Sequence, residues 1–310
     1  MKSVSIVIPF LNESESLREL YQRITVVVRD NSINEYEIIF VNDGSTDNSL
    51  DIVRALAKDD AQVKCIGFRK NYGKAAALSE GFKAARYGYV VTMDADLQDD
   101  PAEIPGLIAE IDTGFDLVSG WKRTRHDPVL TKNLPSKLFN WATSVTSGVR
   151  LHDFNCGLKI YRKEVVKSLE FYGEMHRYLP VLAHWNGFRI GEKEVQHHPR
   201  KYGVTKYGLN RFVNGFLDLL TITFLRRYTK NPMHLFGLFG ILFSLVGFSI
   251  IGYFGVQWIV ERELHIRPLL LLGVGAILMG IQLFSIGLVG EMITHTGKRE
   301  EYQVAEKINL

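Results

Sequence analysis

The chain has 310 residues, 46% of them hydrophobic and 23% charged, which supports one large or two ordinary domains and excludes a disordered chain. The formal net charge of +3 creates no basic field that would require a polyanion, so we expect no nucleic-acid partner. Two cysteines, Cys65 and Cys156, argue against a disulfide framework.

Short apolar runs alternate with helix-like stretches over the first 200 residues. The runs are rich in β-branched residues and too short for helices, and they lie at 4–9, 36–41, 63–68, 89–93 and 117–119. Helical patterns separate the first four of them, near 14–30, 46–58 and 74–86. This alternation predicts an α/β fold with a doubly wound, mostly parallel sheet, whose ligands bind beyond the carboxyl ends of the strands.

Polar residues follow the first and second expected strands, where such a sheet binds its ligand. The first strand is followed by Pro9, Asn12 and Glu13. Within NDGSTD after the second strand, Gly44 suits a tight turn, whereas the Asp43 carboxylate can accept hydrogen bonds from a base or a ribose. A lone aspartate at this position is ambiguous, so the role of Asp43 stays open at this point.

The segment DADLQDDP after the fourth expected strand is the strongest chemical signal. Asp94 and Asp96 have little basic charge nearby in the sequence, so they should repel each other unless a cation lies between them. Hard oxygen ligands of this kind, with Gln98, suit Mg²⁺ or Mn²⁺ completed by substrate phosphates. The competing interpretation is a solvated acidic loop before a helix that starts at Pro101, and it accounts well for Asp99 and Asp100.

Residues 209–225 have apolar side chains at helical spacing opposite a polar stripe. The stripe consists of Arg211, Asn214, Asp218 and Thr221. A surface helix of the globular domain would show the same pattern. Because Arg226 and Arg227 follow and an apolar stretch comes next, we expect this helix to lie in a membrane interface.

Two charge-free stretches, 231–260 and 268–290, are each long enough to cross a bilayer, which takes about 20 residues. Buried core helices are the alternative, but two such segments in succession favour transmembrane spans at about 235–260 and 268–290. Only 261–267 joins them, so they form a hairpin with both ends on one side. Their small residues, such as Gly273 and Gly280, suit close helix contact and would favour self-association into a homo-oligomer.

Lysine and arginine counts orient this hairpin. The residues that flank the two spans are Arg226, Arg227, Lys230, Lys298, Arg299 and Lys307. The connection carries only Arg262 and Arg267, so the bias predicts an integral membrane protein with both termini and the amino-terminal domain in the cytoplasm.

The arrangement as a whole resembles the family 2 glycosyltransferases of GT-A fold, and more narrowly the polyprenyl-phosphate glycosyltransferases. The resemblance covers nearly the full chain and rests on the paired spans and on VSIVIPFLNESESL, EIIFVNDGSTDNS, FRKNYGKAAALSEGFKAA, YVVTMDADLQDDPAEIP, LVSGWKRTR, DFNCGLKIYRKEV and RKYGVTKYG. One departure is Thr205, where serine is expected more often, but the hydroxyl is retained. The resemblance implies a catalytic domain over 1–207, a juxtamembrane region over 208–230, a transmembrane hairpin within 231–295 and a cytoplasmic tail over 296–310.

The resemblance also implies roles for individual residues. The nucleotide pocket would be lined by Pro9, Asn12, Glu13, Asp43, Lys74 and Asp94. The metal on the donor diphosphate, Mg²⁺ or Mn²⁺, would be held by Asp94, Asp96 and Gln98. The transferred sugar and the acceptor phosphate would face Arg123, Arg200 and Lys206, whereas Lys122, Arg125 and Lys201 are interpreted as ordinary surface charge. Asp153 is a candidate base that could instead orient the sugar or pair with a basic neighbour.

The implied activity is inverting transfer of a sugar from a nucleotide sugar to polyprenyl (undecaprenyl) phosphate at the cytoplasmic leaflet. UDP-glucose is the first choice of donor, ahead of GDP-mannose, a UDP-N-acetylhexosamine or an aminopentose donor. A cation assists departure of the diphosphate, and a phosphate acceptor, with a second pKa of about 6, needs no strong base. The alternatives are a processive polysaccharide synthase, a transferase that acts on protein or glycan, and a non-catalytic membrane scaffold.

Overall fold

The computed structural model describes residues 2–123, 134–171, 175–199, 201, 232–261, 268–296 and 304–308. The chain divides into two compact units, one made of Met1–Asp218 with Glu301–Leu310 and the other of Leu219–Glu300. The amphipathic segment expected at 209–225 lies outside the described residues, so its position at a membrane interface stays a prediction.

The first unit is built on an eight-stranded sheet with the strand order β7-β5-β6-β4-β1-β2-β3-β8. The strands are β1 Ser3–Phe10, β2 Glu35–Asn42, β3 Val63–Phe68, β4 Tyr89–Thr92, β5 Leu117–Trp121, β6 Lys159–Arg162, β7 Ile190–Glu194 and β8 Val304–Ile308. Strands β4, β1, β2 and β3 are parallel neighbours, and β5 pairs in parallel with β7. Strands β6 and β8 are antiparallel to their neighbours. The prediction of a mostly parallel α/β sheet is therefore confirmed.

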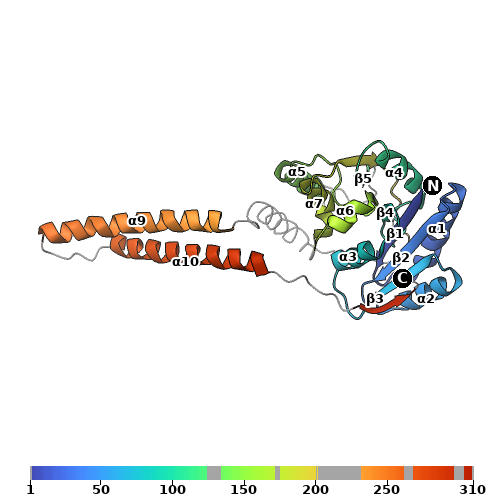
Figure 1. Cartoon of the computed structure of the whole chain (residues 1–310), viewed down its shortest axis with the longest axis horizontal. Helices are drawn as coiled ribbons and strands as arrows, with labels where there is room; N and C mark the ends of the chain where they lie inside the picture. The colour runs from blue at the N-terminus through green and yellow to red at the C-terminus, as the bar shows by residue number, and fades with distance from the viewer. Residues whose placement is uncertain are drawn as a thin grey trace. The chain divides into compact units, whose positions relative to one another are not determined.

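Helices cover both faces of this sheet (Figure 1). The helices of this unit are α1 Leu17–Asp30, α2 Ser49–Asp59, α3 Lys74–Ala84, α4 Ile104–Ile111, α5 Leu134–Ser147, α6 Lys163–Ser168 and α7 Leu179–Trp185, with short 3₁₀ turns η1 Pro101–Glu103 and η3 Met175–Tyr178. On one face, α1, α2 and α4 pack on alternate strand residues such as Ile6 and Phe40. On the other, α3 approaches so closely that a Cβ on Gly81 would lie 2.3 Å from Val7. Right-handed crossovers require this change of face, because β4 returns to the opposite side of β1 from β2.

Strand β8 comes from the far end of the chain, after both long apolar helices. It pairs antiparallel with β3, from Val304 opposite Phe68 to Ile308 opposite Cys65, and it covers the edge that β3 would otherwise expose (Figure 1). No strand was expected in the carboxyl-terminal tail, so β8 is an addition to the predicted sheet.

The second unit is a pair of adjacent helices, α9 Pro232–Glu261 and α10 Pro268–Thr296 (Figure 1). Within them, Met233–Val260 and Pro268–Gly290 are long and apolar enough to span a membrane, and only 17% and 11% of their most apolar windows is buried. A core helix of a soluble domain would be mostly buried, so these helices fit a lipid environment better.

Glycines set the spacing between α9 and α10. A Cβ on Gly280 would lie 2.5 Å from the Gly240 carbonyl oxygen, and one on Gly247 would lie 2.6 Å from the Gly273 carbonyl oxygen. The expectation that Gly273 and Gly280 allow close helix contact is thus confirmed within the hairpin, whereas association between copies stays a prediction.

Replacing Gly247 with Leu should push the two helices apart, because the new side chain meets the Gly273 backbone, and overpacking costs about 1–3 kcal/mol. Spin labels on the exposed positions Leu242 and Ile281, which lie at the same level of the two helices, should then report a longer, broader distance distribution by electron–electron resonance. The matched control is Gly252→Leu, since nothing lies within 4 Å of its Cβ. Identical distributions in the two variants would contradict this account of the packing.

Candidate active site

The chemistry-bearing residues meet at one edge of the sheet. Strands β1, β2, β4 and β5 run in the same direction, so the segments that follow them all leave the sheet at that edge. The structure thus places there Pro9, Asn12, Glu13, Asp43, Asp94, Asp96, Gln98 and Arg123, together with Lys74 at the start of α3. This is the edge where a doubly wound sheet binds its ligand.

The loops after β1 and β2 are tied to each other by side-chain hydrogen bonds. The Asn12 side-chain oxygen accepts a hydrogen bond from the Thr46 backbone amide at 2.8 Å, and the Asn12 backbone amide donates to Ser45 Oγ at 3.0 Å. The Glu13 amide donates to Ser49 Oγ at 2.9 Å. Asn12 takes a left-handed backbone conformation with φ 52°, which asparagine tolerates better than most residues. The exposed Asn12 therefore shapes the rim of the site through its loop contacts.

Asp43 is a buried carboxylate that holds the loop between β3 and α3. It accepts hydrogen bonds from the backbone amides of Tyr72 at 2.7 Å and Gly73 at 3.0 Å, and it is only 5% exposed. Burial raises its pKa above the ordinary value, although the two amide hydrogen bonds oppose that shift. The carboxylate thus fixes the loop that leads into Lys74.

Asp94 is the carboxylate on which several charges converge. Lys74 Nζ contacts its Oδ1. Burial opposes ionisation of Asp94, but the charge of Lys74, and then that of Lys122, outweighs it and lowers the Asp94 pKa to about 2. Gly157 backs the carboxyl group, since a Cβ there would lie 2.7 Å from Asp94 Cγ. Asp94 is thus ionised and sterically confined.

Asp96 and Gln98 lie in the tight turn after Asp94. Asp96 is 7% exposed and accepts a hydrogen bond from the Gln98 amide at 3.2 Å. The Gln98 carbonyl accepts from the His198 amide at 3.0 Å, so the turn is joined to the segment after β7. Asp100 caps η1 by accepting from the Ala102 amide, which confirms a helix start at this point.

Two expectations about charge were wrong. Asp99 does not belong to a solvated loop, because it is 1% exposed and pairs with Lys122 Nζ at 2.7 Å. Lys122 is accordingly not ordinary surface charge, since its side chain is 12% exposed. The acidic turn therefore has basic neighbours. Lys74 and Lys122 supply positive charge that offsets the repulsion between the carboxylates, so this repulsion by itself does not require a cation from solution. Lys201, by contrast, is an exposed surface cation that pairs with Glu19, as expected.

Asp153 lies in a loop held by Glu192. The Glu192 carboxylate accepts hydrogen bonds from the amides of His152 at 2.8 Å and Asp153 at 3.0 Å. Asp153 is 1% exposed, and its Oδ1 accepts from the Asn155 amide at 3.0 Å. Its role as a base stays a prediction, and its burial and its hydrogen bond also fit a structural or orienting role.

The structure describes only one of the three predicted basic residues, Arg123. Arg123 is exposed at the end of β5, 3.4 Å from Glu194 of β7. Arg200 and Lys206 lie outside the described residues, as does Arg125. Residues on either side of Arg200 are described: the His198 ring bonds Asp100, in the turn after β4, at 2.8 Å, and Lys201 bonds Glu19 of α1 at 2.8 Å.

Sequence reasoning missed Gly157, Lys122 and the buried character of Asp99. A signal existed for Lys122, which follows an expected strand at the ligand-binding edge in the same way as Asp43 and Asp94. Gly157 had no comparable signal, because β6 was not expected and its pairing with β4 is what brings that glycine against Asp94.

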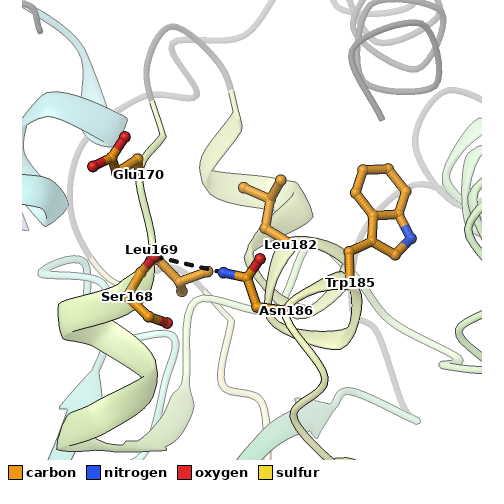
Figure 2. Close-up of a pocket in the computed structure, with 6 residues that line it drawn as sticks. All are labelled: Ser168, Leu169, Glu170, Leu182, Trp185 and Asn186. Carbon is orange, nitrogen blue, oxygen red and sulfur yellow. Dashed lines mark hydrogen bonds between the residues drawn. The ribbon is translucent and has the colours of Figure 1, made fainter. Parts of the chain in front are cut away.

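A hollow of about 250 Å³ lies elsewhere, between α6 and α7 (Figure 2). It is lined by Ser168, Leu169, Glu170, Leu182, Trp185 and Asn186, and Asn186 Nδ2 donates to the Ser168 carbonyl at 3.5 Å. None of these residues lies in the segment directly after β1, β2, β4 or β5, where the predicted site residues are. We therefore place the site at the strand ends.

The donor set at the strand ends fits a divalent cation bound together with phosphate. Among the residues that the structure describes, no group of three or more His, Cys, Asp or Glu forms a metal cluster. Mg²⁺ is commonly held by one or two carboxylates and by substrate phosphates, so a pair such as Asp94 and Asp96 would fit that requirement. Asp94 is ionised against the Lys74 ammonium group, so this chain already supplies part of the positive charge at this position.

Comparison with known proteins agrees with this geometry. The model of the family "Glycosyl transferase family 2" matches residues 5–170, which is more than half of the chain. The chain belongs to this family. It is therefore an enzyme that transfers sugars.

Two relatives match nearly the whole chain. The dodecaprenyl-phosphate galacturonate synthase of Rhizobium johnstonii is 35% identical over 303 residues, covering 96% of this chain and 89% of the relative. The undecaprenyl-phosphate 4-deoxy-4-formamido-L-arabinose transferase of Shewanella sediminis is 37% identical over 300 residues, covering 94% and 86%. These homologues are polyprenyl-phosphate glycosyltransferases, and together with the apolar hairpin they identify a membrane protein.

Solved structures show the GT-A fold. Glucosyl-3-phosphoglycerate synthase from Mycobacterium tuberculosis, with Mn²⁺ and UDP-glucose, superposes with a TM-score of 0.55 at 21% identity, covering 73% of this chain and 79% of the other. The same enzyme with Mg²⁺ and UDP gives a TM-score of 0.54 at 21% identity, with 70% and 79% covered. At this identity the likeness carries the fold alone.

Gly157→Ala should lower kcat/KM for sugar transfer by about 100-fold, because the new methyl group would displace the Asp94 carboxylate, and errors near 1 Å cost that much. Release of nucleoside diphosphate measures the loss. The matched control is Gly88→Ala, since nothing lies within 4 Å of a Cβ at that exposed glycine. Equal activity of the two variants would show that Asp94 is not confined in this way.

Proposed function

We propose that this protein transfers a sugar, with inversion, from a nucleotide sugar to the phosphate of a polyprenyl phosphate. The observation that carries the proposal is a confined, ionised Asp94 at the ligand-binding edge of a sheet, in a chain that also carries a pair of bilayer-length helices. The two relatives act on dodecaprenyl and undecaprenyl phosphates by name, and they align with the hairpin as well as with the sheet.

On the donor side, the loops after β1, β2 and β3 form the nucleotide pocket in this proposal. Pro9, Asn12, Glu13 and Asp43 would line it, and the Asp43 hydrogen bonds to Tyr72 and Gly73 preorganise its wall. Lys74 stands at the start of α3, where its ammonium group can bind the donor diphosphate. The backbone amides at that helix start also favour an anion.

Asp94, Asp96 and Gln98 would hold Mg²⁺ or Mn²⁺ in this proposal. Bound there, the cation supplies Lewis-acid neutralisation of the diphosphate charge that develops as the glycosidic bond breaks. Lys74 keeps the Asp94 carboxylate ionised, and Gly157 confines it.

The acceptor is an anion and needs positive charge rather than a strong base. A phosphate monoester has a second pKa of about 6, so it is mostly a dianion at neutral pH. Arg123, Arg200 and Lys206 would pair with it, and arginine offers two parallel hydrogen bonds to phosphate oxygens. Asp153, which is buried and bonded to the Asn155 amide, would orient the sugar or its neighbours.

The names of the relatives weigh against glucose as the transferred sugar. Galacturonate and 4-deoxy-4-formamido-L-arabinose share an axial substituent at C4, whereas the C4 hydroxyl of glucose is equatorial. We therefore propose a UDP-linked donor with an axial C4 substituent, which keeps the aminopentose donor among the candidates and places UDP-glucose and GDP-mannose behind it.

The hairpin would hold the catalytic domain against the cytoplasmic leaflet, where the acceptor phosphate lies. The first unit contains residues from both before and after the two helices, and this agrees with a hairpin whose ends are on one side. The excess of Lys and Arg at those ends supports the cytoplasmic side.

The purified full-length protein should convert undecaprenyl phosphate to a glycosylated lipid with UDP-galacturonate or a UDP-4-formamido-arabinose about 100-fold more efficiently than with UDP-glucose. A site built around one C4 substituent discriminates by that order of magnitude. Mass spectrometry of the lipid product provides the measurement, and removal of divalent cations with EDTA should abolish transfer. Preferred use of UDP-glucose would overturn the sugar assignment, and no lipid product with any donor would overturn the acceptor.

Replacing residues 231–300 with a flexible glycine-serine linker should lower activity on undecaprenyl phosphate far more than on a short, water-soluble isoprenyl phosphate, because the linker removes only the membrane anchor. A simple truncation after Lys230 would also remove β8 from the sheet and would confuse the two effects. The measurement is the initial rate of transfer to each acceptor, compared between the linker variant and the wild type. Equal loss on the two would mean that the hairpin does more than bring the enzyme to its lipid.

A further inference from the structure

The buried carboxylate of Asp99 joins the acidic turn to the end of β5. Its Oδ2 accepts a hydrogen bond from the Asp94 backbone amide at 3.2 Å, and its Oδ1 lies 2.7 Å from Lys122 Nζ. Asp99 is 1% exposed and the Lys122 side chain 12% exposed, so little solvent reaches the pair. One side chain thus connects the residue that follows β4 with a residue that follows β5.

A third segment meets Asp99. Its backbone forms an antiparallel bridge with His197, and the neighbouring Gln98 carbonyl accepts from the His198 amide at 3.0 Å. This segment leads directly to Arg200, and Lys122 is followed by Arg123. Asp99 is therefore shared by three segments. They are the acidic turn of residues 94–100, called the donor turn below, and the two segments that lead to the proposed acceptor cations Arg123 and Arg200.

A buried ion pair contributes little net stability to a fold. Desolvation of both charges cancels much of their attraction, and well-packed apolar residues often serve stability equally well. Such a pair does fix geometry, because each charge holds its partner in one place. Asp99 in particular restrains a backbone amide of Asp94, which a nonpolar side chain could not do.

We propose that Asp99 and Lys122 are a positioning pair that sets the Asp94 carboxylate for binding of the metal–diphosphate group and aligns the donor turn with the end of β5. Neither residue touches substrate in this proposal, so both act through Asp94. The inference rests on the proposed function, since it assumes that Asp94 binds the donor complex.

The test compares Asp99→Asn, Lys122→Gln and the double variant in the full-length protein in detergent. Asp99→Asn keeps the size of the side chain and an acceptor for the Asp94 amide but leaves Lys122 unpaired. Lys122→Gln leaves Asp99 as an uncompensated buried charge. The double variant restores a neutral, hydrogen-bonding pair, so the cycle isolates the interaction between the two residues.

Mn²⁺ binding in the presence of UDP, measured by electron paramagnetic resonance, is the first readout, and the separate KM and kcat for the donor are the second. Each single variant should weaken Mn²⁺ binding and raise the donor KM by about 10-fold to 100-fold, as is usual when residues that orient metal ligands are lost. The double variant should recover at least part of both. Singles within about twofold of wild type, or purely additive losses, would overturn the proposal even if the melting temperature falls.

Two further variants separate the possible failures. Asp100→Asn is the matched control, because Asp100 lies in the same turn but bonds Ala102 and His198 instead of Asp94, and it should keep wild-type Mn²⁺ binding. Asp94→Asn tests the proposed function itself. If Asp94→Asn leaves Mn²⁺ binding unchanged, the metal assignment fails; if it abolishes binding while the single variants of the pair do not weaken it, only the positioning pair fails.

Discussion

The contact between Lys74 and Asp94 is the interaction on which the site depends. It joins the start of α3 to the end of β4 and keeps a partly buried carboxylate ionised, with a pKa of about 2, where burial alone would favour the neutral acid. Other features of the edge act through one of these two residues: Asp43 holds the loop that leads into Lys74, and Gly157 leaves room for Asp94. A site of this kind would suit the proposed donor, whose diphosphate arrives with a bound cation.

The two units need different surroundings, and this difference separates the chemistry from the membrane anchoring. The sheet can order polar loops at its edge because its core is dry, whereas the hairpin exposes apolar side chains along most of its length and needs lipid around it. Without a hydrophobic driving force between helices in lipid, close packing at Gly240 and Gly247 against α10 supplies the contact. The chemistry and the anchoring thus use different physical principles within one chain.

The central strands could be predicted because strands covered on both faces are continuous runs of β-branched residues. Strands β6 and β7, with sequences KIYR and IGEKE, are short and polar, so their pairing was not visible in the sequence. The positions of Asp43 and Asp94 at the edge of the sheet could be predicted, because each follows an expected strand. The burial of Asp99 and the nearby cations could not, because they depend on contacts such as Lys122 with Asp99 that only the folded chain creates.

Strand β8 has a consequence for biosynthesis. Because it follows α10 in the chain, its pairing with β3 can form only after both apolar helices have left the ribosome. Until then β3 is an open edge, and unpaired edges of this sort attract the strands of other chains. The catalytic sheet of each nascent molecule therefore completes its hydrogen bonding last, after both apolar helices have been synthesised, and slow synthesis of that region would prolong the period in which the β3 edge is open to aggregation.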